Sequence, residues 1–446
     1  MNIILLSGGS GKRLWPLSNN ARSKQFLKLL RSPAGDYESM VQRISRQIAE
    51  SGIEADITVA TSISQYDSIV NQLGSSVDVV TEPERRDTFP AIALSTSYLI
   101  KEKKCSMDEV VVVMPSDSYV EAGYFETIAK MAKAVVSDKV DMVLMGITPT
   151  EASTKFGYIV PNKTASEGDL ITVNRFTEKP DEETAKELIA QNAVWNGGVF
   201  AFKLSYIAKI IDQYIVADTF DEIRNRYSEF KKISFDYEVV EKAKSIGLVP
   251  YSGAWSDLGT WNSLSEKIDD TTLGNATVAE GCDNTHVINE LDLPVICLGA
   301  KDLIVAASPD GILVSSKEAS VNLKGYADTL KARPMYEERR WGTYKVMGHE
   351  HFEDGHNALT KHLLLKADCN ISYQYHNKRE EIWTFVDGEG LLVLDGEVIK
   401  VGRGYVAHIK KGQKHAVRAV TDLQIIEVQA GTDLVEEDIV RLEWEW

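Results

Sequence analysis

The sequence predicts an α/β domain over residues 1–265, a short β segment with a linker over 266–335, and a third, all-β module over 336–446. Three observations support this division. Buried-strand patterns alternate with helical spacing in the first part, and short strands separated by turn residues replace them from about residue 275. Seven of the eight histidines then lie between His349 and His415. A chain of 446 residues has room for several domains of ordinary size.

The composition excludes several classes of protein. Apolar residues make up 43% and charged residues 26% of the chain, as in a globular protein with a real core. The formal net charge of −17 leaves no basic footprint, so we expect no nucleic-acid partner. Four dispersed cysteines form no CxxC pair, which argues against a disulfide scaffold or a thiolate zinc site.

The N-terminus resembles neither a signal peptide nor a membrane span. Its apolar run extends only from Ile3 to Leu6, and no basic region precedes it. No later run approaches the roughly 18 apolar residues that a spanning helix needs. We therefore expect a cytoplasmic protein without a membrane partner.

Short apolar runs mark the strands of the first domain. Asn2–Ser7, Glu109–Met114 and Met142–Ile147 are nearly continuous apolar segments, which is typical of parallel strands buried on both faces. Apolar residues at helical spacing from Met40 to Ile48 predict one helix between them. Another is predicted near Pro90, with this proline in its first turn.

Short strands separated by turn residues mark the middle segment. They are predicted at Thr285–Asn289, Val295–Leu298, Leu303–Ala306 and Ile312–Val314. A helix over Lys317–Lys331 and a linker at Arg333–Pro334 should follow.

Strands of the third module should recur about every 8–12 residues. Asp387-Gly388 and Asp395-Gly396 are predicted hairpin turns. This spacing favours an antiparallel barrel or sandwich.

A glycine-rich segment directly after the first strand predicts a phosphate site. In Leu6-Ser-Gly-Gly-Ser-Gly-Lys-Arg13, the glycines allow backbone N–H groups to form a concave nest for phosphate oxygens. A Walker loop is excluded because Arg13, rather than Ser or Thr, follows Gly11-Lys12. The dinucleotide fingerprint fails because Leu14 replaces its third glycine. On spacing alone, a glycine-rich turn without a ligand stays an alternative.

The residues around this loop resemble the signature of sugar-1-phosphate nucleotidyltransferases, most closely the bacterial mannose-1-phosphate guanylyltransferases. The resemblance continues in the family's order at Ser23–Phe26, Glu82–Ala91, Met114–Asp117, Phe156–Ile159, Phe176–Pro180, Trp195–Phe200, Ser234–Tyr237 and Trp255–Trp261. It implies a Rossmann-like nucleotidyltransferase domain with a mixed sheet. It also implies a place in GDP-mannose and polysaccharide biosynthesis.

The resemblance implies transfer of a nucleotidyl group from GTP to mannose 1-phosphate, giving GDP-mannose and pyrophosphate. In-line attack on the α-phosphorus needs no covalent enzyme intermediate, so catalysis rests on positioning and charge neutralisation. The implied catalytic residues are Arg13, Lys24, Asp117, Lys179 and Asp257. The implied nucleotide-binding residues are Ser7, Gly8, Gly9, Gly11, Arg13, Glu82, Arg86, Asp87, Thr88 and Ser116. The implied sugar-binding residues are Gly157, Tyr158, Glu178, Lys179, Asn196 and Asp236.

Within this set, Asp117 and Asp257 are the implied Mg²⁺ ligands, because Mg²⁺ prefers carboxylate and phosphate oxygens. Asp117 follows an apolar strand, and open α/β sheets bind ligands at that carboxyl edge. Asp87 stands where the family has Asn, and its carboxylate could accept from the N1–H and N2 of guanine. Ser118 replaces a family histidine, and Lys12 and Phe89 also depart from the pattern. Another nucleoside triphosphate or hexose 1-phosphate therefore stays an alternative.

A second group of polar residues lies in the third module. Gln374 and His376 share one strand face, Glu381 follows five residues later, and His415 comes from a distant segment. The pattern resembles the cupin module of type II phosphomannose isomerases. The resemblance implies that these four residues bind Zn²⁺ or another divalent ion.

The activity of this module stays open between alternatives. Asn377, Lys378 and Ile382 stand where the family has histidines, and the family's Tyr-Gly-Arg near the terminus is absent. The module is either a working mannose-6-phosphate isomerase or a sensor or oligomerisation unit, and we expect a homo-oligomer, a dimer. A sugar-nucleotide-binding regulator without turnover is a further alternative for the whole chain.

Overall fold

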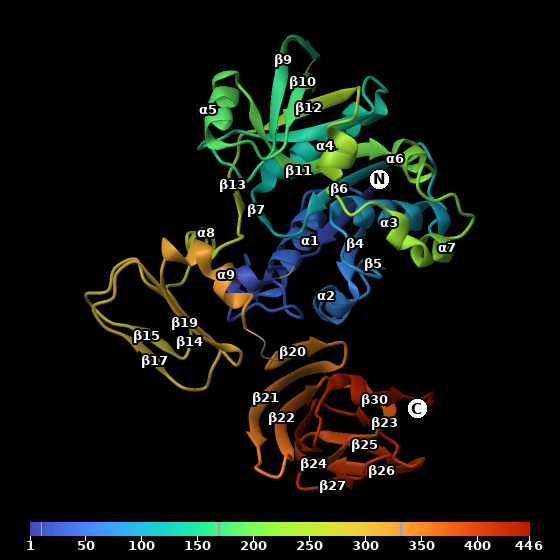
Figure 1. The fold of residues 1–446 in the computed structure, drawn as a ribbon, viewed down its shortest axis with the longest axis vertical. Helices are drawn as coiled ribbons and strands as arrows, with labels where there is room; N and C mark the ends of the chain where they lie inside the picture. Colours follow the sequence, from blue (N-terminus) through green and yellow to red (C-terminus); the bar gives the residue numbers. More distant parts are fainter. Residues whose placement is uncertain (10, 168–169, 331–332) are drawn as a thin grey trace. The chain divides into compact units, whose positions relative to one another are not determined.

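The structure, a computed structural model, describes residues 1–9, 11–167, 170–330 and 333–446 (Figure 1). The chain forms two compact units. The first holds Met1–Ser10 and Ser23–Asp269, and the second holds Gly11–Arg22 and Asp270–Trp446. A short early segment therefore belongs with the C-terminal part of the chain.

A nine-stranded mixed sheet forms the centre of the first unit. Its strands in spatial order are β5 (Asp78–Glu82), β4 (Asp56–Ser62), β1 (Asn2–Ser7), β6 (Val110–Pro115), β11 (Val194–Lys203), β8 (Met142–Ile147), β12 (Ile246–Tyr251), β10 (Leu170–Thr177) and β9 (Tyr158–Glu167). The four strands β5, β4, β1 and β6 run parallel. Because β9 also pairs with β11, the last five strands close into a ring. The predicted strands β1 and β8 are confirmed at their predicted bounds.

Helices cover both faces of this sheet, and each face has its own core. Helix α1 (Met40–Glu50) begins at a capping box made by Ser39 and Gln42, and it buries Ile44 in the same core cluster as Ile128 of α4 (Ala122–Val136). On the other face, α3 (Thr88–Lys101) packs beside α6 (Leu204–Ile211). The remaining helices of this unit are α2 (Tyr66–Leu73), α5 (Glu182–Ala190), α7 (Phe220–Asn225) and α8 (Trp261–Ser265). Both helices predicted from the sequence, α1 and α3, are confirmed, and Pro90 lies in the first turn of α3.

Two short strands outside the main sheet form a ribbon. Strands β7 (Ser118–Val120) and β13 (Trp255–Asp257) pair antiparallel, with Ser118 opposite Asp257. This pairing brings Asp257 next to the residues that follow β6.

Stacked short strands begin the second unit. Strands β14 (Thr272–Gly274), β16 (His286–Asn289) and β18 (Leu303–Ser308) run parallel, and β19 (Gly311–Ser316) adds an antiparallel edge. Strands β15 (Ala276–Val278) and β17 (Val295–Cys297) form a second parallel pair. The four strands predicted here are therefore confirmed.

The helix predicted over Lys317–Lys331 is much shorter in the structure. Only the 3₁₀ turn η6 (Ala319–Asn322) and α9 (Leu323–Ala327) form there, and Lys331 lies outside the described residues. Lys317 is held by the β segment instead, because its N–H donates to Asp302 O at 2.8 Å and its Nζ donates to Asn284 Oδ1 at 2.5 Å. Gly325 further lowers the helix propensity of the segment.

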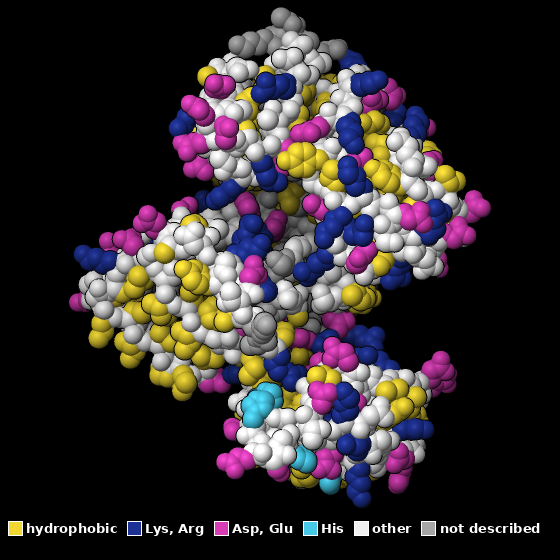
Figure 2. Space-filling view, in the orientation of Figure 1, with side chains coloured by type: hydrophobic (Ala, Val, Ile, Leu, Met, Phe, Trp, Pro, Cys, Tyr) yellow, Lys and Arg dark blue, Asp and Glu magenta, His cyan; other side chains and the backbone are white. Residues whose placement is uncertain are grey.

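Apolar side chains gather on the surface of these stacked strands, where Figure 2 shows a broad yellow area. Ile312 and Val314 on the edge strand β19 are 62% and 65% exposed, and Ile296 on β17 is 65% exposed. Isolated exposed apolar residues are common, but a gathering of them is typical of an interaction surface.

Two antiparallel sheets form the C-terminal part of the second unit. One contains β20 (Tyr336–Arg339), β21 (Gly342–His351), β22 (Asn357–Leu365), β29 (Leu423–Gly431), β24 (Arg379–Asp387) and β27 (Val406–Ile409). The other contains β26 (Glu397–Gly402), β25 (Glu389–Leu394), β28 (His415–Ala419), β23 (Asn370–His376) and β30 (Ile439–Arg441). No helix among the described residues is long and apolar enough to cross a membrane.

One of the two predicted hairpin turns is confirmed, and the other is wrong. Asp395-Gly396 joins the paired strands β25 and β26, and both turn residues have positive φ, 46° and 90°. Asp387-Gly388 instead leads from one sheet to the other, because β24 and β25 do not pair. Glycine is needed there for a different reason: φ is 80°, and a Cβ would lie 2.0 Å from Asp422 O.

Candidate active site and metal cluster

The glycine loop and Asp117 leave the main sheet at the same edge. Strands β1 and β6 are parallel neighbours, with Leu6 opposite Pro115, so the residues after both strands emerge together. A hydrogen bond holds Ser7, the first residue of the loop, because Gln25 Nε2 donates to Ser7 Oγ at 3.2 Å. Gly8 and Gly9 are exposed, and among the described residues no atom lies within 4 Å of a Cβ built on either. This leaves their backbone accessible to a ligand.

Two carboxylates converge on the ammonium group of Lys24. Lys24 Nζ lies 2.7 Å from Asp117 Oδ2 and 2.9 Å from Asp257 Oδ1. Burial opposes the charged form of Lys24, but the two carboxylates outweigh it and raise its pKa. The Lys24 ammonium thus lies between two carboxylates, where a metal cation could also be held. The carboxylates of Asp117 and Asp257 supply the oxygen ligands that Mg²⁺ prefers. Gly259 leaves room for this arrangement, since a Cβ there would lie 3.0 Å from Asp257 Oδ2.

Most of the predicted sugar-binding residues also lie together. Asn196 Nδ2 donates to Asp236 Oδ1 at 2.6 Å, and Lys179 Nζ donates to Glu178 Oε1 at 2.7 Å. Gly157 joins the two pairs, because a Cβ there would lie 2.4 Å from Glu178 Oε2 and 3.4 Å from Asn196 Cβ. Burial, and then the charge of Glu178, raise the pKa of Asp236 to about 7. The group offers amide, carboxylate and ammonium partners for a hydroxylated, phosphorylated ligand.

Tyr158 is placed differently from these residues. Its side chain is fully buried in the core between sheet and helices, and its hydroxyl donates to Ser153 O at 2.9 Å. The hydroxyl is therefore already paired within the protein.

Backbone contacts hold the predicted base-binding segment in place. Asp87 has a φ of 74° and caps α3, because its carboxylate accepts from the Thr88 N–H at 2.8 Å. The hydroxyl of Thr88 in turn accepts from the Phe235 N–H at 2.8 Å, and Arg86 Nε donates to Phe230 O at 3.1 Å.

Glu82 and Ser116 are two further predicted nucleotide-binding residues, and both are buried. Tyr227 donates its hydroxyl to Glu82 Oε2 at 2.8 Å, and burial raises the pKa of Glu82 to about 7. Ser116 donates its hydroxyl to Leu6 O at 2.9 Å, which links the residues after β6 to β1. Both side chains therefore have partners within the first unit.

Gly11 and Arg13 belong to the second unit, although the sequence predicts one continuous glycine loop. Three contacts hold their segment, Gly11–Arg22, inside that unit. Asn19 Nδ2 donates to Asp310 Oδ2 at 2.7 Å, Ser308 donates to Pro16 O at 2.7 Å, and Arg22 pairs with Glu290 at 2.8 Å. Arg13 itself is exposed on this segment.

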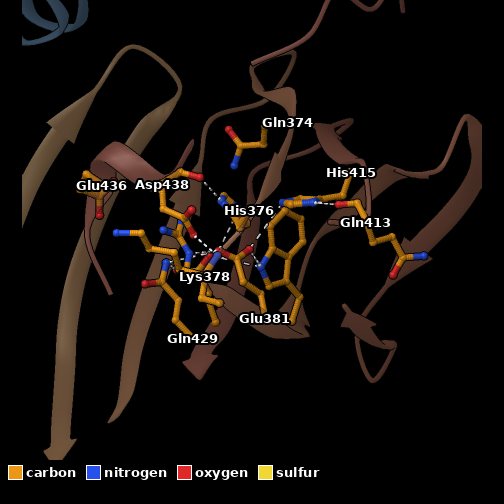
Figure 3. A network of polar contacts seen from close by, with 12 residues as sticks. Gln374, His376, Lys378, Glu381, Gln413, His415, Gln429, Glu436 and Asp438 are labelled. Atoms are coloured by element: carbon orange, nitrogen blue, oxygen red, sulfur yellow. Dashed lines mark hydrogen bonds and ion pairs between the residues drawn. The ribbon is translucent and has the colours of Figure 1, made fainter. Parts of the chain in front are cut away.

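A separate cluster lies between the two C-terminal sheets. Figure 3 shows His376, Glu381 and His415 directed toward one another. They are 2%, 1% and 0% exposed, and one ligand atom from each lies within 4.8 Å of the others. The two His Nε2 atoms face the carboxylate at 3.2 and 3.5 Å.

The outer nitrogens of both histidines face backbone carbonyls. His415 Nδ1 lies 3.0 Å from Gln413 O, and His376 Nδ1 lies 3.4 Å from Asp438 O. Donation from Nδ1–H leaves a lone pair on each Nε2, and neither Nε2 has a hydrogen-bond partner among the described residues. Two unpaired imidazole nitrogens beside a buried carboxylate fit a divalent metal ion.

The fourth predicted ligand, Gln374, is 7% exposed and lies opposite His415 in the pairing of β23 with β28. Its Oε1 accepts from Ser372 Oγ at 3.1 Å. The structure thus brings His376, Glu381 and His415 together, and the role of Gln374 as a fourth ligand stays a prediction.

A buried polar network surrounds Glu381, and it was not predicted from the sequence. Arg379 Nε and Trp383 Nε1 donate to its carboxylate at 2.9 and 3.1 Å, and Glu427 and Gln429 complete the network. A signal was available in β29, where Glu427 and Gln429 take the buried positions of the strand's alternation.

Two family models match separate parts of the chain. The nucleotidyl transferase family matches residues 2–273, and the mannose-6-phosphate isomerase C-terminal family matches residues 329–444. Alginate biosynthesis protein AlgA of Pseudomonas putida is 30% identical, with 99% of this chain and 95% of that protein covered. Xanthan biosynthesis protein XanB of Xanthomonas campestris is also 30% identical, with 99% and 97% covered.

Two further relatives carry names that describe an activity. Mannose-1-phosphate guanylyltransferase RfbM of Salmonella typhimurium is 28% identical, with 99% of this chain and 96% of that protein covered. A crystal structure described as mannose-1-phosphate geranyltransferase from Thermus thermophilus is 27% identical, with a TM-score of 0.62, and covers 74% of this chain and 99% of that one. Fold, family match and full-length relatives agree, and the chain belongs to the nucleotidyl transferase family as an enzyme with an added mannose-6-phosphate isomerase C-terminal region.

Proposed function

We propose that the enzyme transfers a guanylyl group from GTP to mannose 1-phosphate and releases GDP-mannose and pyrophosphate. The convergence of Asp117 and Asp257 on Lys24, at the sheet edge where Ser7–Gly9 emerge, carries this proposal. The names of the relatives, which describe guanylyl transfer and polysaccharide biosynthesis, supply the choice of base and sugar.

The proposed roles follow from charge and position. Asp117 and Asp257 hold Mg²⁺, which when bound neutralises charge on the phosphates. Lys24 Nζ, within 3 Å of both carboxylates, is placed to neutralise a phosphate oxygen that approaches them. The resemblance to the family proposes Arg13, an exposed cation, as a second positive charge for the departing pyrophosphate.

The residues around Gly157 form the proposed mannose 1-phosphate site. Asn196 and Asp236 bind sugar hydroxyls, and Glu178 positions Lys179 for the phosphate. The absence of a side chain at Gly157 keeps the space beside Glu178 open. Asp87 is proposed to select guanine, with its carboxylate as acceptor.

A direct assay tests the reaction. The full chain is incubated with Mg²⁺, each nucleoside triphosphate in turn and a panel of hexose 1-phosphates, and pyrophosphate release is measured. We expect the highest kcat/KM for GTP with mannose 1-phosphate. Faster turnover with UTP or CTP would overturn the choice of base, and no release with any pair would overturn the reaction class.

The C-terminal cluster supports a second candidate function. We propose that residues 336–446 form a cupin-type barrel, which binds Zn²⁺ or another divalent ion through His376, Glu381 and His415. In this proposal, residues 266–335 link the barrel to a transferase domain over residues 1–265. The unpaired Nε2 atoms favour metal-assisted interconversion of mannose 6-phosphate and fructose 6-phosphate. The test adds mannose 6-phosphate with Zn²⁺, Co²⁺ or Mn²⁺ and measures fructose 6-phosphate. Metal binding without turnover would leave this region a sensor or assembly module.

A further inference from the structure

A buried polar network contacts the backbone of the glycine loop in the first unit. Its side chains are those of Ser23 and Gln25, of Thr61 in β4, and of Gln65, three residues beyond the end of β4. All four are buried, and Gln65 is 0% exposed. None of the four is among the site residues predicted from the sequence, so their place beside the loop calls for a role.

The amide of Gln65 is held from both of its ends. Its Nε2 donates to Gly9 O at 3.2 Å and to Ser23 Oγ at 2.5 Å. Its Oε1 accepts from Gln25 Nε2 at 3.4 Å and from Thr61 Oγ1 at 3.1 Å. A carboxamide has two N–H donors and an oxygen that can accept two hydrogen bonds, so every polar group of Gln65 has a partner. The buried amide is therefore fixed in one orientation, with a carbonyl of the loop among its partners.

The same network holds the loop at two carbonyl groups. Gly9 O accepts from Ser23 Oγ at 3.2 Å as well as from Gln65. The Thr61 hydroxyl, which has a single proton, is shared between Gln65 Oε1 and Ser7 O, the latter at 2.9 Å. In a trans peptide the C=O and the N–H point in opposite directions. Because Ser7 O faces Thr61, the N–H of the next residue points away from the network.

The direction of these backbone groups matters for an anionic ligand. A phosphate oxygen is attracted by N–H groups and repelled by carbonyl oxygens. Gly8 and Gly9 are exposed, whereas the partners of Gly9 O are buried, so the network turns this carbonyl away from the exposed side of the loop. A loop that is already held in this way loses less conformational freedom when a ligand binds.

We propose that Gln65 is a positioning residue, which orients the glycine loop for a nucleoside triphosphate by holding Gly9 O. Gln65 is fully buried and does not touch the ligand itself. The proposal rests on the proposed function for the class of ligand, a triphosphate. It does not depend on the base, because the loop acts on the phosphates. Loss of the Gln65 amide should therefore weaken GTP and a triphosphate without a base alike.

Calorimetric titration of the full chain with Mg²⁺, one ligand at a time, tests this role. The probes are GTP and inorganic tripolyphosphate, and mannose 1-phosphate is the comparison ligand. Gln65→Met keeps the length of the side chain and removes its hydrogen bonds, so we expect both triphosphate probes to bind at least about ten-fold more weakly. The affinity for mannose 1-phosphate should stay within about two-fold, because its proposed site lies around Gly157.

Gln42→Met is the matched control. The Gln42 amide also binds backbone groups, the Ser39 N–H at 3.1 Å and Gln72 O at 3.2 Å, but these lie at the cap of α1 and not in the loop. This variant should bind all three ligands as the wild type does, and circular dichroism checks that both variants fold. Wild-type affinity of Gln65→Met for the triphosphate probes would overturn the proposal. An equal loss for mannose 1-phosphate would also overturn it, because it would show a general structural defect.

A gentler variant keeps the proposal testable if Gln65→Met does not fold. Gln65→Asn retains a polar amide within the network but is one methylene too short to reach Gly9 O with the native geometry. We expect a loss of at least about three-fold for both triphosphate probes, again without a change for mannose 1-phosphate. Wild-type binding of the triphosphates by this variant would overturn the role of Gln65.

The titration needs no turnover, so its failure differs from failure of the proposed function. Triphosphate binding that depends on Gln65, without pyrophosphate release from any pair of substrates, would overturn the proposed function alone. Pyrophosphate release with normal triphosphate binding by Gln65→Met would overturn this inference alone. A wild type that binds neither triphosphate probe would overturn both.

Discussion

At the scale of single residues, the arrangement of Lys24 between Asp117 and Asp257 makes a sharp prediction. Asp257→Asn removes one charge from the proposed Mg²⁺ site, so pyrophosphate release should fall about 100-fold or more. The thermal midpoint should change little, because Asp257 lies on a partly exposed ribbon. Asp212→Asn, at the C-terminal end of α6, is the control. Wild-type turnover of the Asp257 variant would contradict the metal assignment.

Lys24 itself should act on the chemical step more than on binding of the acceptor. Lys24→Ala is expected to remove about 2–4 kcal/mol of transition-state stabilisation and so to lower kcat. The KM for mannose 1-phosphate should stay nearly unchanged. Steady-state kinetics measure both constants, and Lys28→Ala, at a nearby exposed lysine, is the comparison. A rise in KM alone would move Lys24 to the sugar site.

Asp236 gives a prediction about pH. Its pKa is raised to about 7 in the fold, first by burial and then by Glu178, whereas in the unfolded chain it is about 4. Its contribution to stability is therefore present at low pH and is lost as pH rises through about 7, because the folded state holds the proton longer. Asp236→Asn keeps an acceptor for Asn196 and removes the titration. From about pH 5 to 8, the thermal midpoint of the wild type should fall more than that of this variant.

The comparison in that experiment isolates Asp236. Glu82, whose pKa is also raised to about 7, titrates in the same range and is present in both proteins. Parallel midpoint curves for the two proteins would show that Asp236 keeps an ordinary pKa.

The sequence could place some of these residues better than others. Asp117 follows an apolar strand, so its position at the sheet edge follows from local pattern. The approach of Lys24 to Asp257 depends on residues 233 positions apart, and only the family resemblance indicated it. For Tyr158 the family motif indicated a sugar-binding side chain, but the side chain lies in the core and its hydroxyl donates to Ser153 O.

At the scale of elements, apolar runs predicted buried strands well, and turn dipeptides predicted connections less well. Strands β1 and β8 have their predicted bounds because burial on both faces leaves a continuous apolar run. Asp395-Gly396 and Asp387-Gly388 are alike in sequence, yet only the first joins paired strands. The difference lies in long-range strand pairing, which two residues cannot encode.

The edge strand β19 carries a prediction about assembly. Ile312 and Val314 present apolar side chains on an edge without charges of their own, and a neutral apolar surface on a strongly acidic chain best matches a second copy of itself. We expect a homodimer through this surface. The double variant Ile312→Glu/Val314→Glu should sediment as a monomer, because like charges would face each other. Sedimentation unchanged from the wild type would exclude this face.

At the scale of the whole molecule, we expect the two proposed chemistries to be separable. His415→Ala removes one of three clustered donors in the second unit, so bound metal measured by atomic emission should fall about ten-fold or more. Pyrophosphate release should stay within about two-fold, because Lys24, Asp117 and Asp257 all lie in the first unit. Loss of both would show that the metal also supports the transferase.

The placement of Gly11–Arg22 has a consequence for recombining this enzyme with its relatives. A chimera joined once, at residues 269 and 270, would take the segment that carries Arg13 from one parent and its packing partners Glu290, Ser308 and Asp310 from the other. Such hybrids should be poorly active even when each parental half is sound. Exchange of Gly11–Arg22 together with Asp270–Trp446 keeps these contacts native. The module that can be transferred between relatives is therefore discontinuous along the gene.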